Sequence, residues 1–259
     1  MNEVYQHYRK EEKEFINQVY HWLNEVENYY TPYLSHFLTP REALIVQQIV
    51  GKRDEVRLAF HGGREGAERQ RALLYPSYYE VQADDYALTV LNIKFPTKFG
   101  ELSHGRILGT LLSTGIDRNR IGDIITDGAR WQVMVDRAIH EFLIQQVTKI
   151  ANVGVHLEMI ADEDVLTSLE EWDTQTLIAS SLRLDTLIAK VYNFSRQRAK
   201  DVIAANLVKV NFVETLQPDF EVGVQDIVSV RKKGRFWVGE IEGTTKKDNY
   251  RLKVNIIVK

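Results

Sequence analysis

The segment FSRQRAKDVIAANLVKVN, residues 194–211, carries the densest structural signals in the sequence. Ser195 is a favourable N-cap residue for a helix that starts at residue 196, because its hydroxyl oxygen can accept a backbone N–H of the first turn. Asn206 tolerates the left-handed backbone conformation that often ends a helix. The following LVKVN reads as a strand, so the segment predicts a short helix followed directly by a strand.

Cationic side chains gather at the start of this helix. Arg196 and Arg198 follow the cap, and Lys200 comes four residues after Arg196, so Arg196 and Lys200 share one stripe of the helix. A helix N-terminus already attracts anions through its backbone N–H groups and its dipole. The pattern fits a phosphate-binding surface, and it also fits a solvated charged helix face. The spacing alone leaves both interpretations open.

The flanking sequence completes a small α+β domain. SLRLDTLIAKVYN (181–193) places apolar side chains near one helical face, and Asn193 ends that helix. DIVSVR (226–231) reads as a strand. GRFWVGEIEG (234–243) and NYRLKVNIIVK (249–259) read as a terminal hairpin. Two helices followed by these strands are therefore expected over residues 181–259.

This C-terminal part resembles the S4 RNA-binding domain. The residues that match the family pattern are Arg183, Leu184, Asp185, Ser195, Arg196, Ala199, Ile203, Val208, Val210, Asn211, Asp226, Val230 and Arg231. Two positions depart from the pattern, because Asn206 and Phe212 stand where the family usually has glycine. The family usually has a glycine directly before an aspartate, whereas here two residues separate Gly223 from Asp226.

The resemblance implies an RNA-binding face on this domain. The residues expected to contact RNA are Arg183, Ser195, Arg196, Arg198, Lys200, Lys209, Arg231, Lys232, Lys233 and Arg235. Asp185, Asn206, Asn211 and Asp226 are expected to have structural or orienting roles, with Asp185 orienting Arg183 or capping its helix. Phe236 and Trp237 could stack on a base, but we expect them to pack in the core of the hairpin.

The charge distribution supports a polyanionic partner for this domain. The 259-residue chain has a net charge of −3. Residues 181–259 carry 15 Lys and Arg against 9 Asp and Glu, whereas the other 180 residues carry 18 against 27. A basic domain on an acidic body favours a nucleic-acid partner for the basic part, although uneven charge also arises by chance.

Composition excludes several other classes of protein. The chain contains no cysteine, which excludes disulfides, thiolate metal sites and cysteine nucleophiles. No apolar run approaches the length of a membrane span, and the polar start MNEVYQHYRKEEKEF does not resemble a secretory signal. We therefore expect a cytoplasmic protein with no membrane partner, no metal and no cofactor.

Residues 1–52 are predicted to be a helical segment. Phe15, Val19, Trp22, Leu23 and Val26 lie on one face of a helix. The TPRE motif at 39–42 predicts a second helix, with Thr39 as N-cap, Pro40 in the first turn and Glu42 closing a capping box. This second helix is expected to end at Gly51.

Residues 53–160 are predicted to form a small α+β domain. Strands are expected at 55–60, 86–95 and 153–160, with a helix over 104–115 capped by Ser103 and another over 136–151. Asp127-Gly128 predicts a hairpin between apolar runs. The order of elements indicates a ferredoxin-like or RRM-like outline with helices on one face. No RNP-type run of aromatics is present, so we assign no RNA binding to this sheet.

The segment 161–180 is acidic and sparsely apolar, and it is predicted to link this body to the domain at 181–259. The glycine-rich HGGREG (61–66) lacks the order of a nucleotide-binding P-loop and is expected to turn the chain after a strand. Arg64, Arg69 and Arg71 near it offer phosphate contacts as an alternative. The predicted fold class is therefore α+β, with a helical segment, a central RRM-like domain and an S4 domain.

Two stretches of the body extend the resemblance to one family. GGREGAERQRALLYPSYY (62–79) and LGTLLSTGIDRNRIGDI (108–124) are similar to the body of YlmH-type proteins, which carry a C-terminal S4 domain. The resemblance implies a non-catalytic factor that binds ribosomal RNA and tRNA on the large ribosomal subunit, in quality control of stalled complexes that hold peptidyl-tRNA. Other quality-control factors are further partners that the resemblance suggests.

Two other functions stay open at this point. An RNA-modifying enzyme, such as a pseudouridine synthase or a methyltransferase, can use an S4 domain for docking, but residues 54–160 show neither the large catalytic sheet domain nor a nucleotide-type glycine loop after a strand. A division-linked adaptor would instead bind proteins through the N-terminal helices. Neither a GxSxG elbow nor any other catalytic motif is visible, so no catalytic residue is assigned.

Overall fold

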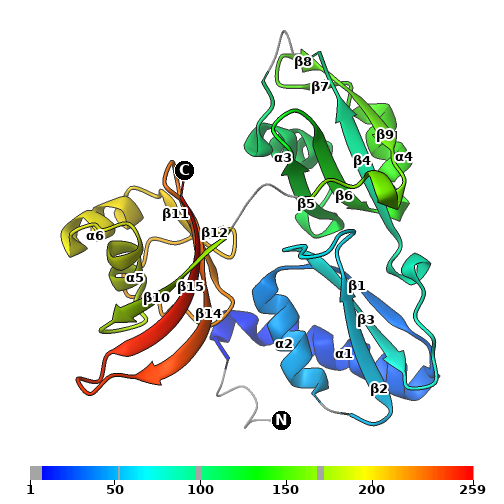
Figure 1. The fold of residues 1–259 in the computed structure, drawn as a ribbon. Coiled ribbons are helices and arrows are strands. Elements are labelled where there is room, and N and C mark those ends of the chain that lie inside the picture. The colour runs from blue at the N-terminus through cyan, green and yellow to red at the C-terminus, as the bar shows by residue number, and fades with distance from the viewer. Residues whose placement is uncertain (1–7, 52, 97–100, 168–171, 259) are drawn as a thin grey trace. The chain divides into compact units, whose positions relative to one another are not determined.

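The computed structural model describes residues 8–51, 53–96, 101–167 and 172–258. The chain divides into two units, residues 1–169 and 170–259, and each is described by itself (Figure 1). Among the described residues, no helix has the length and apolar character that crossing a membrane requires.

The first half of unit 1 is a three-stranded sheet with two helices. Its elements are α1 (Lys13–Tyr29), β1 (Tyr33–Leu38), α2 (Pro40–Val50), β2 (Val56–His61) and β3 (Gln70–Pro76). The antiparallel sheet has the order β1-β3-β2. The predicted face of α1 is confirmed, because Val19, Trp22, Leu23 and Val26 are buried against α2 and this sheet and Phe15 is partly buried there.

Two predictions about this region are wrong. Residues 33–38 form a strand inside the segment predicted to be helical, and the strand expected at 55–60 pairs with β3 in this first sheet rather than in the central domain. Strand β1 is six residues long and its first two residues are only partly buried. Its place is set by pairing with β3, more than thirty residues away along the chain, so no local sequence pattern predicts the strand.

The start of α2 follows the predicted capping box. The Thr39 hydroxyl oxygen accepts the backbone N–H of Glu42 at 3.2 Å, and the Glu42 carboxylate accepts the backbone N–H of Thr39 at 2.7 Å. Pro40 is the first helical residue, and Gly51 ends the helix with φ at +59°. These contacts satisfy backbone groups that a helix end otherwise leaves without partners.

The second half of unit 1 has the predicted ferredoxin-like order of elements. They are β4 (Leu88–Lys94), α3 (His104–Ser113), β5 (Ile121–Thr126), β6 (Trp131–Asp136), α4 (His140–Gln146), the short pair β7 (Lys149–Ile150) and β8 (Val153–Gly154), and β9 (His156–Met159). The antiparallel sheet has the order β5-β6-β4-β9. The predicted hairpin is confirmed with Asp127 and Gly128 in its loop, and Gly128 takes a left-handed φ of 92°.

Both faces of this central sheet are covered at their middle. Helices α3 and α4 pack on one face around Leu91, Ile107 and Val133. On the other face Phe37 of β1 and Leu166 pack with Val90, Ile125 and Met134. The buried side chain of Gln132 holds the covering segment, since it donates to the Asp164 carbonyl at 2.9 Å and accepts the Leu166 N–H at 2.8 Å.

Two buried arginines join the halves of unit 1. Arg69 is 4% exposed and donates to the carbonyls of Phe37 at 3.0 Å and Ile121 at 3.3 Å. Arg71 is 6% exposed and donates to the carbonyls of Ser35 at 2.7 Å and of Tyr86 and Ala87, both at 3.1 Å. Their guanidinium groups therefore bond backbone within the protein, which argues against the phosphate contacts considered for them.

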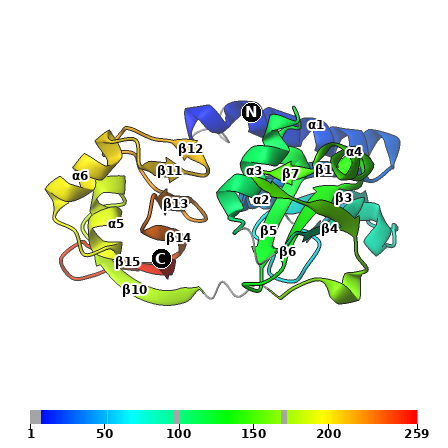
Figure 2. The same ribbon diagram turned by 90° about the horizontal axis from the view of Figure 1, so that it is seen from above.

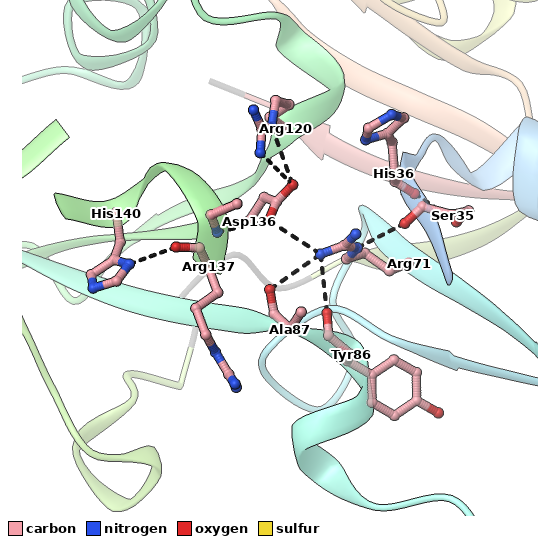
Figure 3. Close-up of polar contacts among 10 residues, drawn as sticks. Ser35, His36, Arg71, Tyr86, Ala87, Arg120, Asp136, Arg137 and His140 are labelled. Carbon is pink, nitrogen blue, oxygen red and sulfur yellow. Dashed lines mark hydrogen bonds and ion pairs between the residues drawn. The ribbon is translucent and has the colours of Figure 1, made fainter. Parts of the chain in front are cut away.

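A carboxylate compensates the charge of Arg71, as Figure 3 shows. Asp136 lies 3.6 Å from Arg71, and it also pairs with Arg120 at 3.0 Å. Burial lowers the pKa of Arg71, while the charge of Asp136 acts in the opposite direction. A buried charge is tolerated only when it is paired and hydrogen-bonded in this way.

Unit 2 is a six-stranded antiparallel sheet with two helices. Its elements are β10 (Asp173–Ala179), α5 (Leu184–Val191), α6 (Arg196–Ala204), β11 (Val208–Val210), β12 (Val213–Glu214), β13 (Ile227–Val230), β14 (Gly234–Thr244) and β15 (Tyr250–Val258), in the sheet order β10-β15-β14-β13-β11-β12. Figure 1 and Figure 2 show α5 and α6 on one side of this sheet. The core between them contains Leu187, Ala199, Ile203, Phe236 and Val254.

The predicted linker over 161–180 is corrected at both ends. Residues 164–166 cover the central sheet, and residues 173–179 are strand β10 at the edge of the C-terminal sheet, paired with β15. Residues 168–171 of the predicted linker lie outside the described residues. Strand β10 escaped prediction because it is an edge strand, with only Ala179 fully buried.

We expect replacement of Arg71 by alanine to destabilise unit 1 by about 3 kcal/mol, because three buried carbonyls and part of the Asp136 carboxylate lose their partner. Denaturant unfolding of the full chain would measure the change. Arg57→Ala, at an exposed position on the neighbouring strand β2, is the matched control and should stay within about 0.5 kcal/mol. Equal stabilities of the two variants would contradict the joining role of Arg71.

Candidate RNA-binding site

The helices α5 and α6 position the predicted RNA-binding residues of unit 2. The start of α5 is tied to the loop before β13, since Leu184 N–H donates to the Phe220 carbonyl at 2.9 Å and Asp185 N–H to the Pro218 carbonyl at 3.0 Å. These backbone donors are therefore already used. The cationic side chains, rather than the end of α5, must supply the attraction for an anion.

A buried carboxylate at the start of α5 orients two arginines. Asp185 has no exposed surface, and it accepts from Arg183 in a two-pronged contact at 3.1 and 3.0 Å. Arg196, from the first turn of α6, donates to the same carboxylate at 3.4 Å. The side chains of Arg183 and Arg196 remain 38% and 57% exposed. Both guanidinium groups are thus held from the inside and open to solvent on the outside.

The pKa of Asp185 reflects this arrangement. Burial by itself raises the pKa of a carboxyl group, but the hydrogen bond from Arg183 and the positive charges of Arg196 and Arg183 outweigh it. The pKa of Asp185 therefore lies below its ordinary value. The carboxylate stays ionised at neutral pH, and its hold on the two arginines persists there.

Helix α6 begins at Arg196 with Ser195 as its N-cap, as the sequence predicts. The Ser195 hydroxyl oxygen accepts the backbone N–H of Arg198 at 3.1 Å. This bond uses one of the first-turn N–H groups that were considered for phosphate. Arg196 and Arg198 are exposed and Lys200 is partly buried, while Ala199 of the same helix is in the core. RNA contact by Ser195 and these cations stays a prediction.

An aromatic ring links α6 to the turn between β13 and β14. The Arg198 guanidinium carbon lies 4.1 Å from the centre of the Phe194 ring, and the Lys233 ammonium nitrogen lies 5.8 Å from it. Cations are attracted to an aromatic face at such distances. The structure thereby brings Lys233 beside the α6 cations. No local sequence pattern predicts this role of Phe194, because its partners Arg198 and Lys233 are brought to the ring by the fold.

The turn after β13 presents three cations in a row. Arg231, Lys232 and Lys233 are exposed, and Lys232 adopts a left-handed φ of 63°. The Arg231 N–H donates to the Leu207 carbonyl at 2.9 Å, which ties this turn to the segment between α6 and β11. Lys233 from this turn and Arg198 from α6 both lie over the ring of Phe194. The turn and the start of α6 therefore present cations on the same face of unit 2, the face that carries the helices.

Two of the predicted RNA-binding residues lie elsewhere. Lys209 lies between the core residues Val208 and Val210 on β11, so its side chain leaves the sheet on the face opposite the helices. Ser229 is its neighbour on β13, and Arg235 is the next on β14. Lys209 and Arg235 therefore do not lie on the face that carries the helices. The expectation that they extend the cationic surface there is corrected, because successive residues of a strand point to opposite faces of the sheet.

Arg235 takes part in an aromatic group on that opposite face. Its guanidinium carbon lies 5.1 Å from the centre of the Trp172 ring, and the Trp172 and Trp237 rings meet edge to face at 6.3 Å. Phe236 is fully buried in the core, as predicted. Trp237 is not part of that core, and its predicted packing there is wrong because adjacent strand residues point to opposite faces.

The predicted structural residues hold the loops around the site. Asn206 has a left-handed φ of 56°, and its amide donates to Glu214 at 2.8 Å. The Asn211 amide donates to the buried Asp226 at 2.8 Å, and its oxygen accepts the Ile227 N–H at 3.0 Å. Phe212, where glycine is usual, keeps a left-handed φ of 69°. The glycine-like backbone is thus retained although the residue is bulky.

These features define the class of protein: an α+β protein whose C-terminal unit has the cationic helical face expected of an RNA-binding domain. Two family models match the rest of the chain, "YlmH, N-terminal" over residues 11–79 and "Putative RNA-binding domain in YlmH" over residues 81–164. The chain is 36% identical over 252 residues to the "Ribosome-associated protein quality control protein P2" of Bacillus subtilis (strain 168), which covers 97% of this chain and 98% of that protein. The chain therefore belongs to the YlmH family.

A solved structure agrees with this assignment. The "Cell division protein ylmH from Streptococcus pneumoniae" is similar with a TM-score of 0.54 and 29% identity, over 63% of this chain and 99% of that one. The description of the second family model attaches RNA binding to the central domain, which corrects the expectation that assigned none to it. In the structure Phe37 and Leu166 cover the middle of the sheet face that lacks helices, which is the face on which RRM sheets stack bases.

We expect Asp185→Asn to weaken binding to structured RNA by about tenfold, a loss of about 1.4 kcal/mol. The reason is that Arg183 and Arg196 lose the charge that aligns them, which outweighs the gain of one net positive charge. Filter binding or fluorescence anisotropy with the full chain measures the affinity. Asp201→Asn, at an exposed position of α6, makes the same charge change and should bind RNA as well as or better than the native chain. A gain in affinity for both variants would show that Asp185 does not orient the site.

The same carboxylate predicts a pH dependence of stability. Because the folded pKa of Asp185 is depressed, its stabilising contribution is present above the unfolded pKa of about 3.9 and is lost as the pH falls through the folded value. The stability difference between the native chain and Asp185→Asn should therefore be constant near neutral pH and shrink below about pH 4. Urea unfolding at a series of pH values measures it, and a difference that grows on acidification would refute this assignment.

Proposed function

We propose that this protein is a non-catalytic factor that binds ribosomal RNA and tRNA on the large ribosomal subunit, in quality control of stalled complexes that hold peptidyl-tRNA. The observation that carries the proposal is the pair of arginines, Arg183 and Arg196, aligned by the buried Asp185 beside the cations of α6. The printed name of the Bacillus subtilis relative supports the ribosomal setting, since that protein is called ribosome-associated.

The helical face suits folded RNA rather than a particular base sequence. Its guanidinium and ammonium groups contact phosphates, and such contacts position a protein without reading sequence. Arg183 and Arg196 can each offer a planar fork to phosphate oxygens, which lysine cannot do. Specificity then comes from the shape of the RNA, which fits recognition of a folded ribosomal element or of a tRNA.

We expect Arg196→Ala combined with Lys200→Ala to weaken RNA binding and to flatten its salt dependence. Each lost phosphate contact should reduce the slope of log affinity against log salt concentration by roughly 0.7 to 0.9, so the double variant should lose about 1.4 to 1.8. Titrations at several salt concentrations measure the slope. Lys10→Ala combined with Lys13→Ala removes the same charge from unit 1 and should leave the slope unchanged. Identical slopes for both double variants would place the RNA contact elsewhere.

Two further measurements test the ribosomal and non-catalytic parts of the proposal. The native chain should sediment with purified large subunits through sucrose, and the Arg196→Ala, Lys200→Ala variant should remain at the top of the gradient. Incubation with ribosomal RNA, with and without S-adenosylmethionine, should yield no modified nucleoside. A new pseudouridine or methylated nucleoside would instead establish an RNA-modifying enzyme.

A further inference from the structure

Three tyrosines form an exposed aromatic patch on unit 1. Tyr29, Tyr30 and Tyr78 are 66%, 64% and 68% exposed. The Tyr78 hydroxyl donates to the Tyr30 carbonyl at 2.7 Å, which joins the end of α1 to the turn after β3. We call these three residues the tyrosine patch. Aromatic rings in such a group cost free energy in water, and tyrosine is enriched in protein interfaces.

The backbone at Tyr30 adopts a conformation that a different residue would take more easily. Tyr30 ends α1 with φ at 54° and ψ at 33°, and its N–H donates to the Val26 carbonyl at 3.0 Å. Glycine or asparagine is usual at a left-handed helix end, and a bulky side chain there is strained. A tyrosine at this position does not serve the helix end itself. Strain of this kind concentrates where a side chain has another task.

The turn that carries Tyr78 is held firmly. The Ser77 N–H donates to the Glu55 carbonyl at 2.9 Å, and the Tyr79 N–H donates to the Pro76 carbonyl at 2.9 Å. The Tyr79 hydroxyl donates to the Asp85 carboxylate, also at 2.9 Å. A ring presented from such a backbone loses little conformational entropy when a partner binds. Rigid aromatic anchors of this kind dominate many binding surfaces.

The charges beside the patch select the class of partner. The carboxylates on the segments that carry and hold the patch include Glu25, Glu27, Glu55, Glu80 and Asp85. Arg53 on a neighbouring segment is paired with Glu27 at 3.2 Å. Residues 1–169 as a whole carry 24 Asp and Glu against 18 Lys and Arg. An acidic aromatic surface repels phosphate, whereas Lys and Arg side chains pair with the carboxylates and stack on the rings.

We propose that the tyrosine patch is a docking surface for a Lys- and Arg-bearing protein segment of the large ribosomal subunit. This inference rests on the proposed function, because it takes the ribosomal particle as the place of binding. It adds a protein contact through unit 1 to the RNA contact through unit 2. The two contacts are chemically opposite, since one surface is acidic and aromatic and the other is cationic.

The first test compares whole large subunits with ribosomal RNA stripped of protein. Tyr30→Asn combined with Tyr78→Ser should weaken binding to subunits by ten- to a hundredfold and leave binding to the stripped RNA unchanged. Tyr30→Asn should also leave the unfolding midpoint of the chain unchanged or raise it, because asparagine accepts the left-handed backbone. The unfolding midpoint of the double variant, measured in the same way, separates a loss of affinity from a loss of folding.

Two controls sharpen this comparison. Tyr78→Phe keeps the ring and removes only the bond to the Tyr30 carbonyl, so most of the affinity for subunits should remain. Phe142→Ser removes a 44% exposed aromatic from α4 and should have no effect. Full subunit affinity in the Tyr30→Asn, Tyr78→Ser variant would overturn the proposal, and so would an equal loss of affinity for the stripped RNA.

The second test identifies the partner directly. With p-benzoylphenylalanine in place of Tyr78, irradiation in the presence of purified large subunits should cross-link the chain to a basic protein segment, whereas the same group in place of Gln197, an exposed residue of α6 that is not among the predicted RNA contacts, should cross-link to RNA. A cross-link from position 78 to RNA, or none, overturns the docking inference. If position 197 also yields no cross-link to the subunit, the proposed function itself fails.

Discussion

A buried carboxylate, Asp185, sets the geometry of the cationic helical face of unit 2. It has no exposed surface, and both of its oxygens accept bonds from Arg183 while Oδ2 also accepts from Arg196. Desolvating a carboxylate is costly, so it must keep these partners to remain charged. The two guanidinium groups are thereby fixed with their outer edges toward solvent. An exposed cation without such an inner partner would lose side-chain entropy on meeting a phosphate, and here part of that ordering is already present in the fold.

The same principle holds the body of the chain together. In unit 1 Arg71 reaches three carbonyls from β1 and from the segment before β4, and Asp136 compensates its charge. Positive charge therefore has two roles. In unit 1 the guanidinium group of Arg71 is buried and bonds backbone carbonyls, whereas in unit 2 those of Arg183 and Arg196 are open to solvent. This difference explains why counting arginines does not locate a nucleic-acid site. Arg69 and Arg71 near the glycine-rich segment are structural, although their sequence context looks as suitable for phosphate as that of Arg196 and Arg198.

The central domain has an RRM-like outline and lacks the open sheet face on which RRM domains stack bases. Phe37 and Leu166 pack over Val90, Ile125 and Met134 at the middle of that face. A fold therefore does not transfer its usual binding mode when a neighbouring element covers the surface concerned. The cationic surface in unit 2 and the acidic aromatic one in unit 1 instead divide recognition between nucleic acid and protein in our proposals.

The sequence alone determined those features of this protein that depend on residues close together in the chain. The capping box of Thr39 and Glu42, the cap at Ser195, the left-handed Asn206 and the ferredoxin-like order of elements depend on near neighbours or on periodic burial, and all are found in the structure. The tertiary structure decided what depends on distant partners. Strands β1 and β10 exist through pairing with β3 and β15, and Lys233 meets Arg198 only over the ring of Phe194. Lys209 and Arg235 leave the sheet on the other face, because strand register sets the direction of every second side chain. Local conformational propensity depends on adjacent residues. Strand pairing, the face to which a side chain points and the burial of a charge are decided only when segments far apart in the chain are brought together.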